Sequence, residues 1–386
     1  MTFVSILFWS TVAICIYTQM VYPLLMYLFA ILPKRSHRVA STDATALPSV
    51  TLIIPAYNEE LVIAEKLENA LALDYPAESL EIIVASDGSD DGTVDIAGRF
   101  ESRGVKLLPF EGRRGKASVI NDAISAASGS VVCLCDANVM FEAGALKKLV
   151  ERFADSEVGA VSGEVRLASD ESNFGQGESA YYGIERLVQQ GESEFGSLIG
   201  VDGGMYALRR ELFEPLPPDT VLDDFVIAMQ VIRRGKRVVY EPEAVATENG
   251  TELARQEFRR RVRVSAGAAQ ALKRGDWPPL VRPIEFWQFV SHKLLRWLGP
   301  AMLIVLLASN VLLWNQGVVY RVTGLGQVLL YALAALATFS LRFRNTRVGG
   351  VVFYFVLSHV AMIPGLIKGF LSRQQGTWTR TERRAA

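Results

Sequence analysis

The sequence has 386 residues, of which 50% are hydrophobic, 21% charged and 10% aromatic, and its formal net charge at pH 7 is -1. This composition excludes a disordered chain, and the near-neutral charge excludes a protein that binds nucleic acid through a general positive field. The three cysteines and three histidines are scattered along the chain, which gives neither a disulfide framework nor a set of zinc ligands. Carboxylates are therefore the side chains left to hold a metal ion.

The first apolar segment covers residues 1–32 and contains no charged residue. A helix rises about 1.5 Å per residue, so this length crosses a hydrocarbon layer of about 30 Å. The segment has neither the early basic residues nor the small-residue cleavage site of a secretory signal peptide, and residues 1–33 are predicted to be a transmembrane anchor. Lys34, Arg35 and Arg38 follow, which places the next domain on the cytoplasmic side by the positive-inside tendency.

The soluble domain is predicted to cover residues 48–275, where short β-branched segments alternate with helical segments. This alternation is typical of βαβ units, which form an α/β fold around a mostly parallel sheet. Ligands of such sheets bind beyond the carboxyl ends of the strands, and polar clusters follow three of the predicted strands there. The predicted strands cover residues 50–54, 81–86, 105–108 and 131–135, and the predicted helices cover residues 60–72, 91–103 and 116–127.

The C-terminal part of the chain is predicted to return to the membrane. Residues 276–297 mix aromatic rings with basic side chains, as an interfacial helix does, and residues 298–371 contain three apolar spans, at 298–314, 326–341 and 349–371. Three complete crossings leave the basic tail at 372–386 on the outer face, whereas an interruption of the last span at Pro364 and Gly365 leaves it in the cytoplasm. The sequence leaves both arrangements open.

Four aspartates are expected at one rim of the sheet, because Asp87, Asp136, Asp223 and Asp224 end predicted strands or lie in loops. Converging acids indicate a divalent cation, since carboxylates bind Mg²⁺ or Mn²⁺ while a substrate diphosphate supplies further oxygens. Asn138 stands two positions after Asp136 and is expected to point to the same side. A single aspartate at a strand end is more often a turn or capping residue, so the hypothesis rests on the four together.

The pair Asp223 and Asp224 begins a predicted helix. Two interpretations compete for it. The pair caps the helix and complements its dipole, or one of the acids is a general base beside bound phosphate and metal.

Arginines gather in the helical segment at residues 257–263, with few acids nearby. Arg260 and Arg263 are three residues apart and share a helix face, so their guanidinium groups are suited to bind a diphosphate. The competing interpretation is a basic helix that lies on anionic lipid headgroups.

Two nucleotide-binding motifs are absent from the sequence. Residues 112–116 are not a phosphate loop, because Phe110 and Ala117 stand where such a loop needs glycine and serine or threonine. Arg113 and Arg114 in this segment are instead predicted to form a solvated surface turn. No GxGxxG pattern follows the first strand, so dinucleotide binding is not supported.

The order and spacing of the motifs resemble the membrane-anchored members of glycosyltransferase family 2, the inverting family of the cellulose, chitin and hyaluronan synthases and of many exopolysaccharide enzymes. The resemblance covers nearly the whole chain. It implies a GT-A fold, which is a Rossmann-like mixed and mostly parallel sheet with helices on both faces, here flanked by transmembrane helices at both ends. The motifs are VTLIIPAYNEE at 50–60, ASDGSDDGT at 85–93, GRRGKASVINDAI at 112–124, CDANVM at 135–140, DGGMYALRR at 202–210, LDDFVIAMQVIRRGKRVVYEP at 222–242 and RRVRVSAGAAQAL at 260–272.

The resemblance also implies roles for single residues. The donor nucleotide would lie against residues from four motifs, namely Ala56, Tyr57, Glu59, Asp87, Lys116 and Asp136. Asp136 and Asn138 align with the metal-binding DxD motif, although Asn138 stands where the family has a second acid. Gly203 and Gly204 align with the acceptor-side glycine motif, and Asp224 aligns with the catalytic base, with Asp223 beside it.

Residues 260–264 align with the QxxRW signature of the synthases, which assigns diphosphate binding to Arg260 and Arg263. Arg260 replaces the glutamine of the signature and keeps a hydrogen-bond donor. Val264 replaces the tryptophan that lines the acceptor site in processive synthases, which argues against long-chain polymerisation.

The function implied by the resemblance is that of an inverting, metal-dependent hexosyl or N-acetylhexosaminyl transferase that uses Mg²⁺ or Mn²⁺. It would move a sugar from a nucleotide-activated donor, with a UDP-sugar favoured, to a saccharide or lipid-linked acceptor in polysaccharide or exopolysaccharide biosynthesis. The protein would be a multi-pass protein of the inner or plasma membrane with a cytoplasmic catalytic domain. Membrane lipid, polysaccharide-assembly proteins or further copies of the chain would be its partners, and nucleic acid would not. Two alternatives stay open: a processive synthase that also translocates its product, and a catalytically silent scaffold that binds nucleotide sugar.

Overall fold

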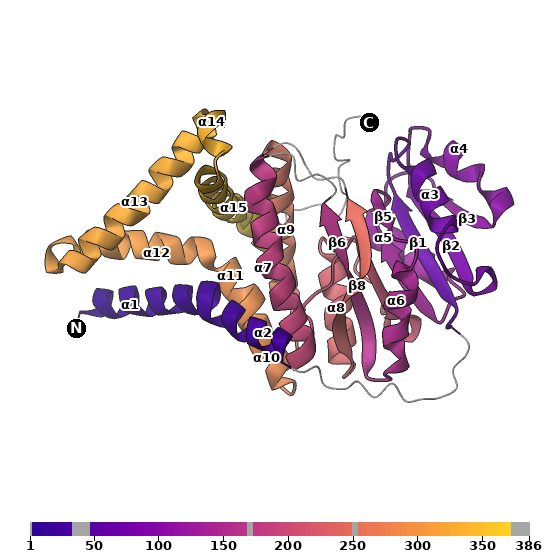
Figure 1. Cartoon of the computed structure of the whole chain (residues 1–386), viewed down its shortest axis with the longest axis horizontal. Helices are drawn as coiled ribbons and strands as arrows, with labels where there is room; N and C mark the ends of the chain where they lie inside the picture. Colours follow the sequence, from indigo (N-terminus) through magenta and orange to yellow (C-terminus); the bar gives the residue numbers. More distant parts are fainter. Residues whose placement is uncertain (1, 33–46, 168–172, 249–253, 372–386) are drawn as a thin grey trace.

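The computed structural model describes residues 2–32, 47–167, 173–248 and 254–371. The basic residues at 34–38 and the basic tail at 372–386 lie outside the described residues. An α/β domain occupies one end of the long axis and a group of helices occupies the other, with the long helices α7 (Asn173–Phe195) and α9 (Ala254–Arg274) standing between them (Figure 1).

A single eight-stranded sheet forms the centre of the domain, in the order β3-β2-β1-β4-β7-β6-β8-β5. The first four strands of this order are parallel, and β7 runs antiparallel to both of its neighbours. The sheet is therefore mixed, as the GT-A expectation requires. The strands are β1 (Val50–Ala56), β2 (Leu80–Asp87), β3 (Val105–Phe110), β4 (Val131–Cys135), β5 (Val139–Phe141), β6 (Val158–Leu167), β7 (Met205–Arg209) and β8 (Arg237–Glu248).

The apolar runs of the sequence become strands because both faces of the sheet are covered by helices. In β1, Leu52 packs into the core on the side of α3 (Ile63–Leu71) and α6 (Ala145–Glu151), whereas Ile53 packs into the core on the side of α5 (Lys116–Ser125) and α8 (Asp223–Arg233). Successive side chains of a strand point to opposite faces, so a strand that is buried on both faces needs an unbroken apolar run.

The four strands predicted at residues 50–135 are confirmed, and the structure extends three of them by one or two residues at an end. The prediction of one continuous helix at 91–103 is wrong. The segment is divided into α4 (Thr93–Gly98) and a short 3-10 turn at Glu101–Arg103. Glycines end both pieces, and Gly104 adopts φ of 91°, a left-handed conformation that glycine reaches without strain.

Three helices among the described residues are long and apolar enough to cross a membrane: Phe3–Ile31, Val318–Phe339 and Arg347–Phe370. The first joins α1 (Phe3–Ile16) and α2 (Tyr22–Ile31), the second is α13 and the third is α15. The apolar stretch predicted at 298–314 is the second half of a bent pair, Pro283–Trp297 and Gly299–Leu312, whose axes differ by 60°. This pair includes α10 (Pro283–Gln288), α11 (Leu295–Trp297) and α12 (Gly299–Leu312).

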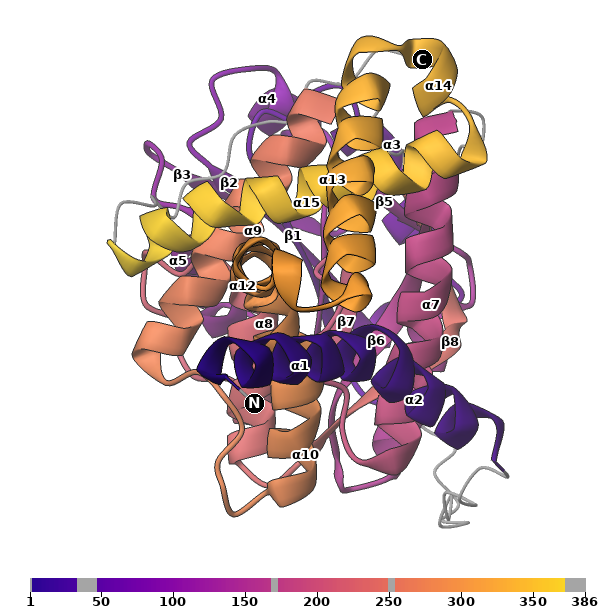
Figure 2. The ribbon, with the colours of Figure 1, turned by 90° about the vertical axis from the view of Figure 1, so that its left-hand side faces the viewer.

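Helix α15 packs against α9 and α7 of the domain. It runs through Pro364 without a break, so of the two arrangements left open by the sequence, the structure does not show the one in which Pro364 and Gly365 interrupt the helix. Its glycines bring it close to α9, because a Cβ on Gly369 would lie 2.2 Å from the carbonyl oxygen of Ala266. Helix α12 is seen lengthwise in Figure 1 and end-on in Figure 2, while α15 is seen end-on in Figure 1 and lengthwise in Figure 2, so the two helices run at a large angle to each other.

Candidate active site

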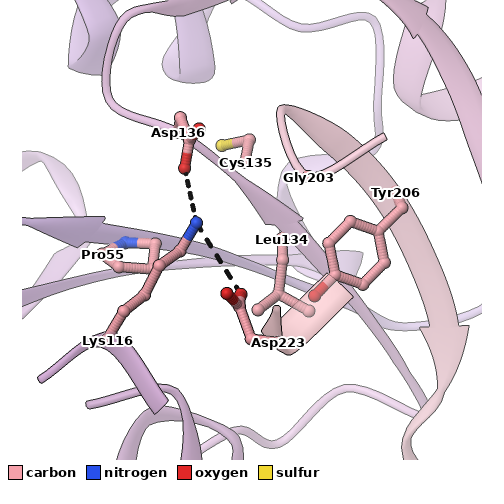
Figure 3. Close-up of a pocket in the computed structure, with 8 residues that line it drawn as sticks. All are labelled: Pro55, Lys116, Leu134, Cys135, Asp136, Gly203, Tyr206 and Asp223. Atoms are coloured by element: carbon pink, nitrogen blue, oxygen red, sulfur yellow. Dashed lines mark hydrogen bonds and ion pairs between the residues drawn. The ribbon is translucent and has the colours of Figure 1, made fainter. Parts of the chain in front are cut away.

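A pocket lies at the carboxyl edge of the sheet, where β1 and β4 end side by side in parallel. Residues far apart in the sequence line this pocket, and several of them point toward one another (Figure 3). The lining residues are Pro55, Lys116, Leu134, Cys135, Asp136, Gly203, Tyr206 and Asp223. Four of the residues singled out from the sequence, Lys116, Asp136, Gly203 and Asp223, therefore lie together here.

Lys116 is the first residue of α5 and links two of the aspartates (Figure 3). Its Nζ lies 2.8 Å from Asp136 Oδ1 and 3.7 Å from Asp223 Oδ2. Burial disfavours the charged amine, but the nearby carboxylates outweigh this effect and raise the pKa of Lys116. The pocket therefore keeps one ammonium group between acids that belong to two different elements.

Asp224 lies in the first turn of α8, beside the glycine turn at residues 203–204. A Cβ on Gly203 would lie 3.1 Å from Asp224 Oδ2, so the missing side chain leaves room for the carboxylate. Burial and the charge of Asp223 raise the pKa of Asp224 to about 6, although Lys116 and Arg263 act in the opposite direction. A carboxylate with a pKa near neutrality is suited to accept a proton from a substrate.

Asp202 is an acid that the sequence analysis did not single out. Its Oδ1 accepts a hydrogen bond from the backbone N of Gly204 at 3.0 Å. Burial and the charges of Glu248, Asp224 and Asp136 raise the pKa of Asp202 to about 7, even though that hydrogen bond favours the ionised form. Asp202 thus lies within electrostatic reach of acids from three other elements.

Asp136 and Asn138 do not lie on one extended strand, as their spacing had predicted. They belong to a turn after β4, in which the backbone N of Val139 donates to the carbonyl oxygen of Asp136 at 3.2 Å. Asn138 is 9% exposed, and its Nδ2 donates to Glu248 Oε1 at 2.7 Å. Among the described residues, no three histidine, cysteine, aspartate or glutamate side chains come together closely enough to hold a metal ion.

The loops after β1 and β2 contain the residues predicted to bind the nucleotide. Asp87 is fully buried, and its carboxylate accepts hydrogen bonds from the backbone N of Arg114 at 2.6 Å and of Gly115 at 3.1 and 3.2 Å. It therefore holds the loop before α5 against the end of β2. Contact between Asp87 and a nucleotide stays a prediction.

Arg113 was predicted to be part of a solvated surface turn, and it is exposed in the loop before α5. Its guanidinium lies 3.8 Å from the centroid of the Tyr57 ring, in a cation-π contact between two loops. Ala56 is the buried last residue of β1, and the backbone N of Glu59 donates a hydrogen bond to Thr93 Oγ1 at 2.8 Å. Tyr57 and its neighbours therefore lie on the sheet edge where the nucleotide was predicted.

The two arginines predicted to bind a diphosphate have different surroundings. Arg260 Nε donates to Glu257 Oε2 at 2.7 Å, and Arg261 Nε donates to Glu257 Oε1 at 2.7 Å. Glu257 is fully buried, and although burial opposes its charge, the two arginines hold the pKa of Glu257 below its usual value. The expectation of few nearby acids is therefore wrong for Arg260, whereas Arg263 is close enough to Asp224 to lower its pKa.

Three residues in or near the pocket were missed from the sequence: Tyr206, which lines it, and Asp202 and Glu248, whose charges act on the acids beside it. Asp202 and Tyr206 stand inside the motif at 202–210, but only its glycines were weighed. The Tyr206 hydroxyl is buried, has no hydrogen-bond partner among the described residues, and faces Asp223 and Leu134 (Figure 3). Glu248 carries no local signal, because it reaches the site through strand pairing.

Comparison with known proteins identifies the domain. Residues 51–216 match the family described as "Glycosyl transferase family 2". This match ends before Asp223, Asp224, Glu248 and Arg263, so these four residues lie beyond the matched part.

Two curated relatives extend the match. A protein of Bacillus subtilis named "Probable glycosyltransferase YdaM" is 29% identical over 235 residues, which is 57% of this chain and 55% of the relative. The "Poly-beta-1,6-N-acetyl-D-glucosamine synthase" of Staphylococcus epidermidis is 25% identical over 263 residues, which is 66% of this chain and 63% of the relative. The aligned part thus spans about three fifths of the length of these relatives.

Among solved structures, a mannosyltransferase from Pyrobaculum calidifontis, in complex with GDP-Man and Mn²⁺, is similar to this chain. The two share 25% identity and a TM-score of 0.69, and the alignment covers 95% of this chain and 99% of the other. The similarity includes the helices at both ends of the domain. The chain therefore carries a family 2 glycosyltransferase domain with a GT-A fold, as the sequence motifs predicted.

Proposed function

We propose that this protein is an inverting glycosyltransferase that moves a sugar from a nucleotide-activated donor to an acceptor at the membrane surface. One observation carries the proposal: acids from separate elements, Asp136, Asp223 and Asp224, converge around Lys116 and the glycine turn at the carboxyl edge of the sheet. A purely structural role does not need several partly uncompensated acids in one pocket.

Asp224 is the proposed general base. Its carboxylate takes the proton from an acceptor hydroxyl while that oxygen attacks the anomeric carbon of the donor sugar. The bond from this carbon to the diphosphate oxygen breaks on the opposite face, so the anomeric configuration inverts. Burial and Asp223 keep the pKa of Asp224 at about 6, which lets it accept a proton yet remain ionised at neutral pH.

The departing diphosphate carries negative charge that needs cationic partners. Lys116 lies at the N-terminus of α5, where the helix dipole also favours an anion, and Arg263 lies within electrostatic reach of Asp224. We assign both residues to the diphosphate. Arg260 is held by Glu257, so we give it the lesser role of supporting α9.

The residues at the β4 turn fit a hard divalent cation such as Mg²⁺ or Mn²⁺. Asp136 Oδ2 and Asn138 Oδ1 have no hydrogen-bond partner among the described residues, and carboxylate and amide oxygens are the ligands these cations prefer. The two residues alone provide too few ligands, so the donor diphosphate would supply others. When bound, the cation neutralises charge on the leaving group.

The membrane arrangement follows from the helices around α9. Helix α15 packs on α9 and α7 and runs at a large angle to α12, so we assign it to the membrane surface, with α1, α12 and α13 in the bilayer. In this arrangement the domain is cytoplasmic and the basic tail is on the same side. A reporter fused to the C-terminus should behave as a cytoplasmic one, and an external position would contradict the assignment.

The proposed activity is tested with the full-length protein in detergent or nanodiscs. A panel of UDP-, GDP- and TDP-sugars is supplied with membrane lipid extract as acceptor, with and without Mn²⁺, and release of nucleoside diphosphate is measured. We expect release from one class of donor and an inverted linkage in the product by NMR. No release with any donor, although nucleotide sugar binds, would favour the silent scaffold instead.

A processive synthase is the second candidate, since the Staphylococcus epidermidis relative is named as a polysaccharide synthase. Against it stands Val264, at the position where processive synthases have tryptophan. The same assay separates the two. A single added sugar supports transfer, and a ladder of products supports polymerisation.

A further inference from the structure

Asn138 is held by a carboxylate from a distant part of the chain. Its Nδ2 donates to Glu248 Oε1 at 2.7 Å, although the two residues are 110 positions apart in the sequence. The contact follows from the sheet, because β5 pairs with β8 in antiparallel register and Val139 is opposite Glu248. The turn that carries Asp136 and Asn138 is thus tied to the end of β8.

This hydrogen bond fixes the orientation of the Asn138 amide. An ionised carboxylate can only accept hydrogen bonds, so the NH₂ group must face Glu248 and the carbonyl oxygen must point away from it. Asn138 is 9% exposed, and its Oδ1 has no hydrogen-bond partner among the described residues. An amide oxygen without such a partner is suited to a hard cation.

The negative charge of Glu248 also acts on an acid beside the pocket. Burial and the charges of three acids raise the pKa of Asp202. Glu248 contributes the largest of these three charge effects, and Asp224 and Asp136 contribute smaller ones. The carboxylate that a DxD motif would carry at position 138 is therefore present nearby, on a different strand.

We propose that Glu248 is a positioning residue for the divalent cation. It orients Asn138 so that the amide oxygen faces the cation, and it supplies from outside the coordination shell the charge that Asn138 lacks. The inference rests on the proposed function, in which Asp136 and Asn138 hold the metal. The opposing interpretation is that the hydrogen bond only secures the end of β8, in which case metal affinity does not depend on Glu248.

The test measures Mn²⁺ affinity by electron paramagnetic resonance, on the full-length protein with UDP or GDP present and no acceptor. Glu248→Ala removes both orientation and charge, and we expect the affinity to fall about 10- to 100-fold, the usual cost of losing a group that orients a metal ligand. Glu248→Gln keeps an acceptor for Asn138 and removes only the charge, so its loss should be smaller. Glu243→Gln, on the exposed part of the same strand, is the matched control and should leave affinity unchanged.

Exchanging the amide and the carboxylate between positions 138 and 248 distinguishes a positioning role of Glu248 from a purely structural one. Asn138→Asp alone puts two carboxylates in the place of the 2.7 Å hydrogen bond, and because a bound cation relieves their repulsion, Mn²⁺ affinity should rise above that of the parent protein. Adding Glu248→Gln restores one amide and one carboxylate in exchanged positions. We expect the affinity of the double variant to return to within about threefold of that of the parent protein. Thermal unfolding of each variant identifies any loss that comes from misfolding.

Two results overturn the inference. Unchanged affinity in a folded Glu248→Ala variant would show that Glu248 does not act on the cation. A double variant that remains folded but binds Mn²⁺ much more weakly than the parent protein would contradict the exchange of charge. If the parent protein binds no Mn²⁺ at all, both the inference and the metal dependence in the proposed function fail, whereas donor turnover without metal would leave the transferase proposal standing.

Discussion

Two clusters of buried ionisable side chains in this protein differ in their balance of negative and positive charge. In the pocket at the sheet edge, the carboxylates outnumber the cations among the described residues, since Lys116 alone pairs with Asp136 and Asp223. In the second cluster, where α7 meets α2 and the segment at 289–297, both carboxylates contact His292 and each has a further donor. Glu192 Oε1 accepts from His292 Nδ1 at 2.8 Å and from the Tyr22 hydroxyl, while Glu185 contacts His292 Nε2 at 2.7 Å and Arg296 Nη1 at 2.6 Å.

The pKa values of the acids differ between the two clusters accordingly. Burial alone would raise the pKa of Glu185, but His292 and Arg296 hold it well below its usual value. The pKa of Asp224 is instead raised to about 6, and that of Asp202 to about 7. A buried cluster that is neutralised within the chain joins two parts of the protein, whereas a cluster with surplus acid is suited to bind a cation or a proton.

The largest expected effect comes from neutralising the proposed base. Asp224→Asn should lower the rate of sugar transfer by about 10² to 10⁴, because the acceptor hydroxyl loses its proton acceptor. Nucleotide binding, measured by calorimetry, should be retained. Unchanged transfer by the folded variant would remove the assignment of the base.

The second prediction concerns the neutralised cluster. Glu192→Ala leaves His292 and the Tyr22 hydroxyl without their shared acceptor, and it should cost about 3–5 kcal/mol of stability. The thermal unfolding midpoint in detergent measures the effect. Glu214→Ala is the matched control, because the Glu214 and Arg234 side chains are 53% and 44% exposed and such a pair contributes about 1 kcal/mol or less. A loss no larger than that of the control would contradict a structural role for Glu192.

The smallest expected effect is a gain in stability, whereas the two effects above are losses. The pKa of Asp224 rises from 3.8 to about 6 in the folded protein, so the folded state keeps a proton that the unfolded state has released. The stabilisation from that proton is complete below about pH 4 and is lost as the pH rises through about 6. Asp224→Asn should therefore stabilise the protein at pH 7.5, on the order of 1 kcal/mol, and have no effect at pH 4.

Melting curves of the Asp224→Asn variant at pH 7.5 and at pH 4 test this expected gain in stability. Asp223→Asn is the comparison, since it removes a partner of Lys116 and should give no gain. A variant that is destabilised at pH 7.5 would mean that the pocket, like the second cluster, is neutralised by its own residues.

The sequence by itself determined four of the eight strands, the apolar helices and the order of the motifs. Strand β4 has the predicted bounds because a strand buried on both faces needs a continuous apolar run, which is visible locally. Lys116 and Asp136 were likewise found from their motifs, and parallel pairing of β1 with β2 and β4 brings the strand ends to one edge.

Only the tertiary structure decided which charges meet. It pairs Arg260 with Glu257, lays Arg113 on Tyr57, and joins Asn138 to Glu248 through the register of β5 and β8. None of these contacts leaves a periodic signal, because periodicity reports which face of an element is buried and not which element lies opposite. Strand register and side-chain reach set those partners, and both depend on how the whole chain packs.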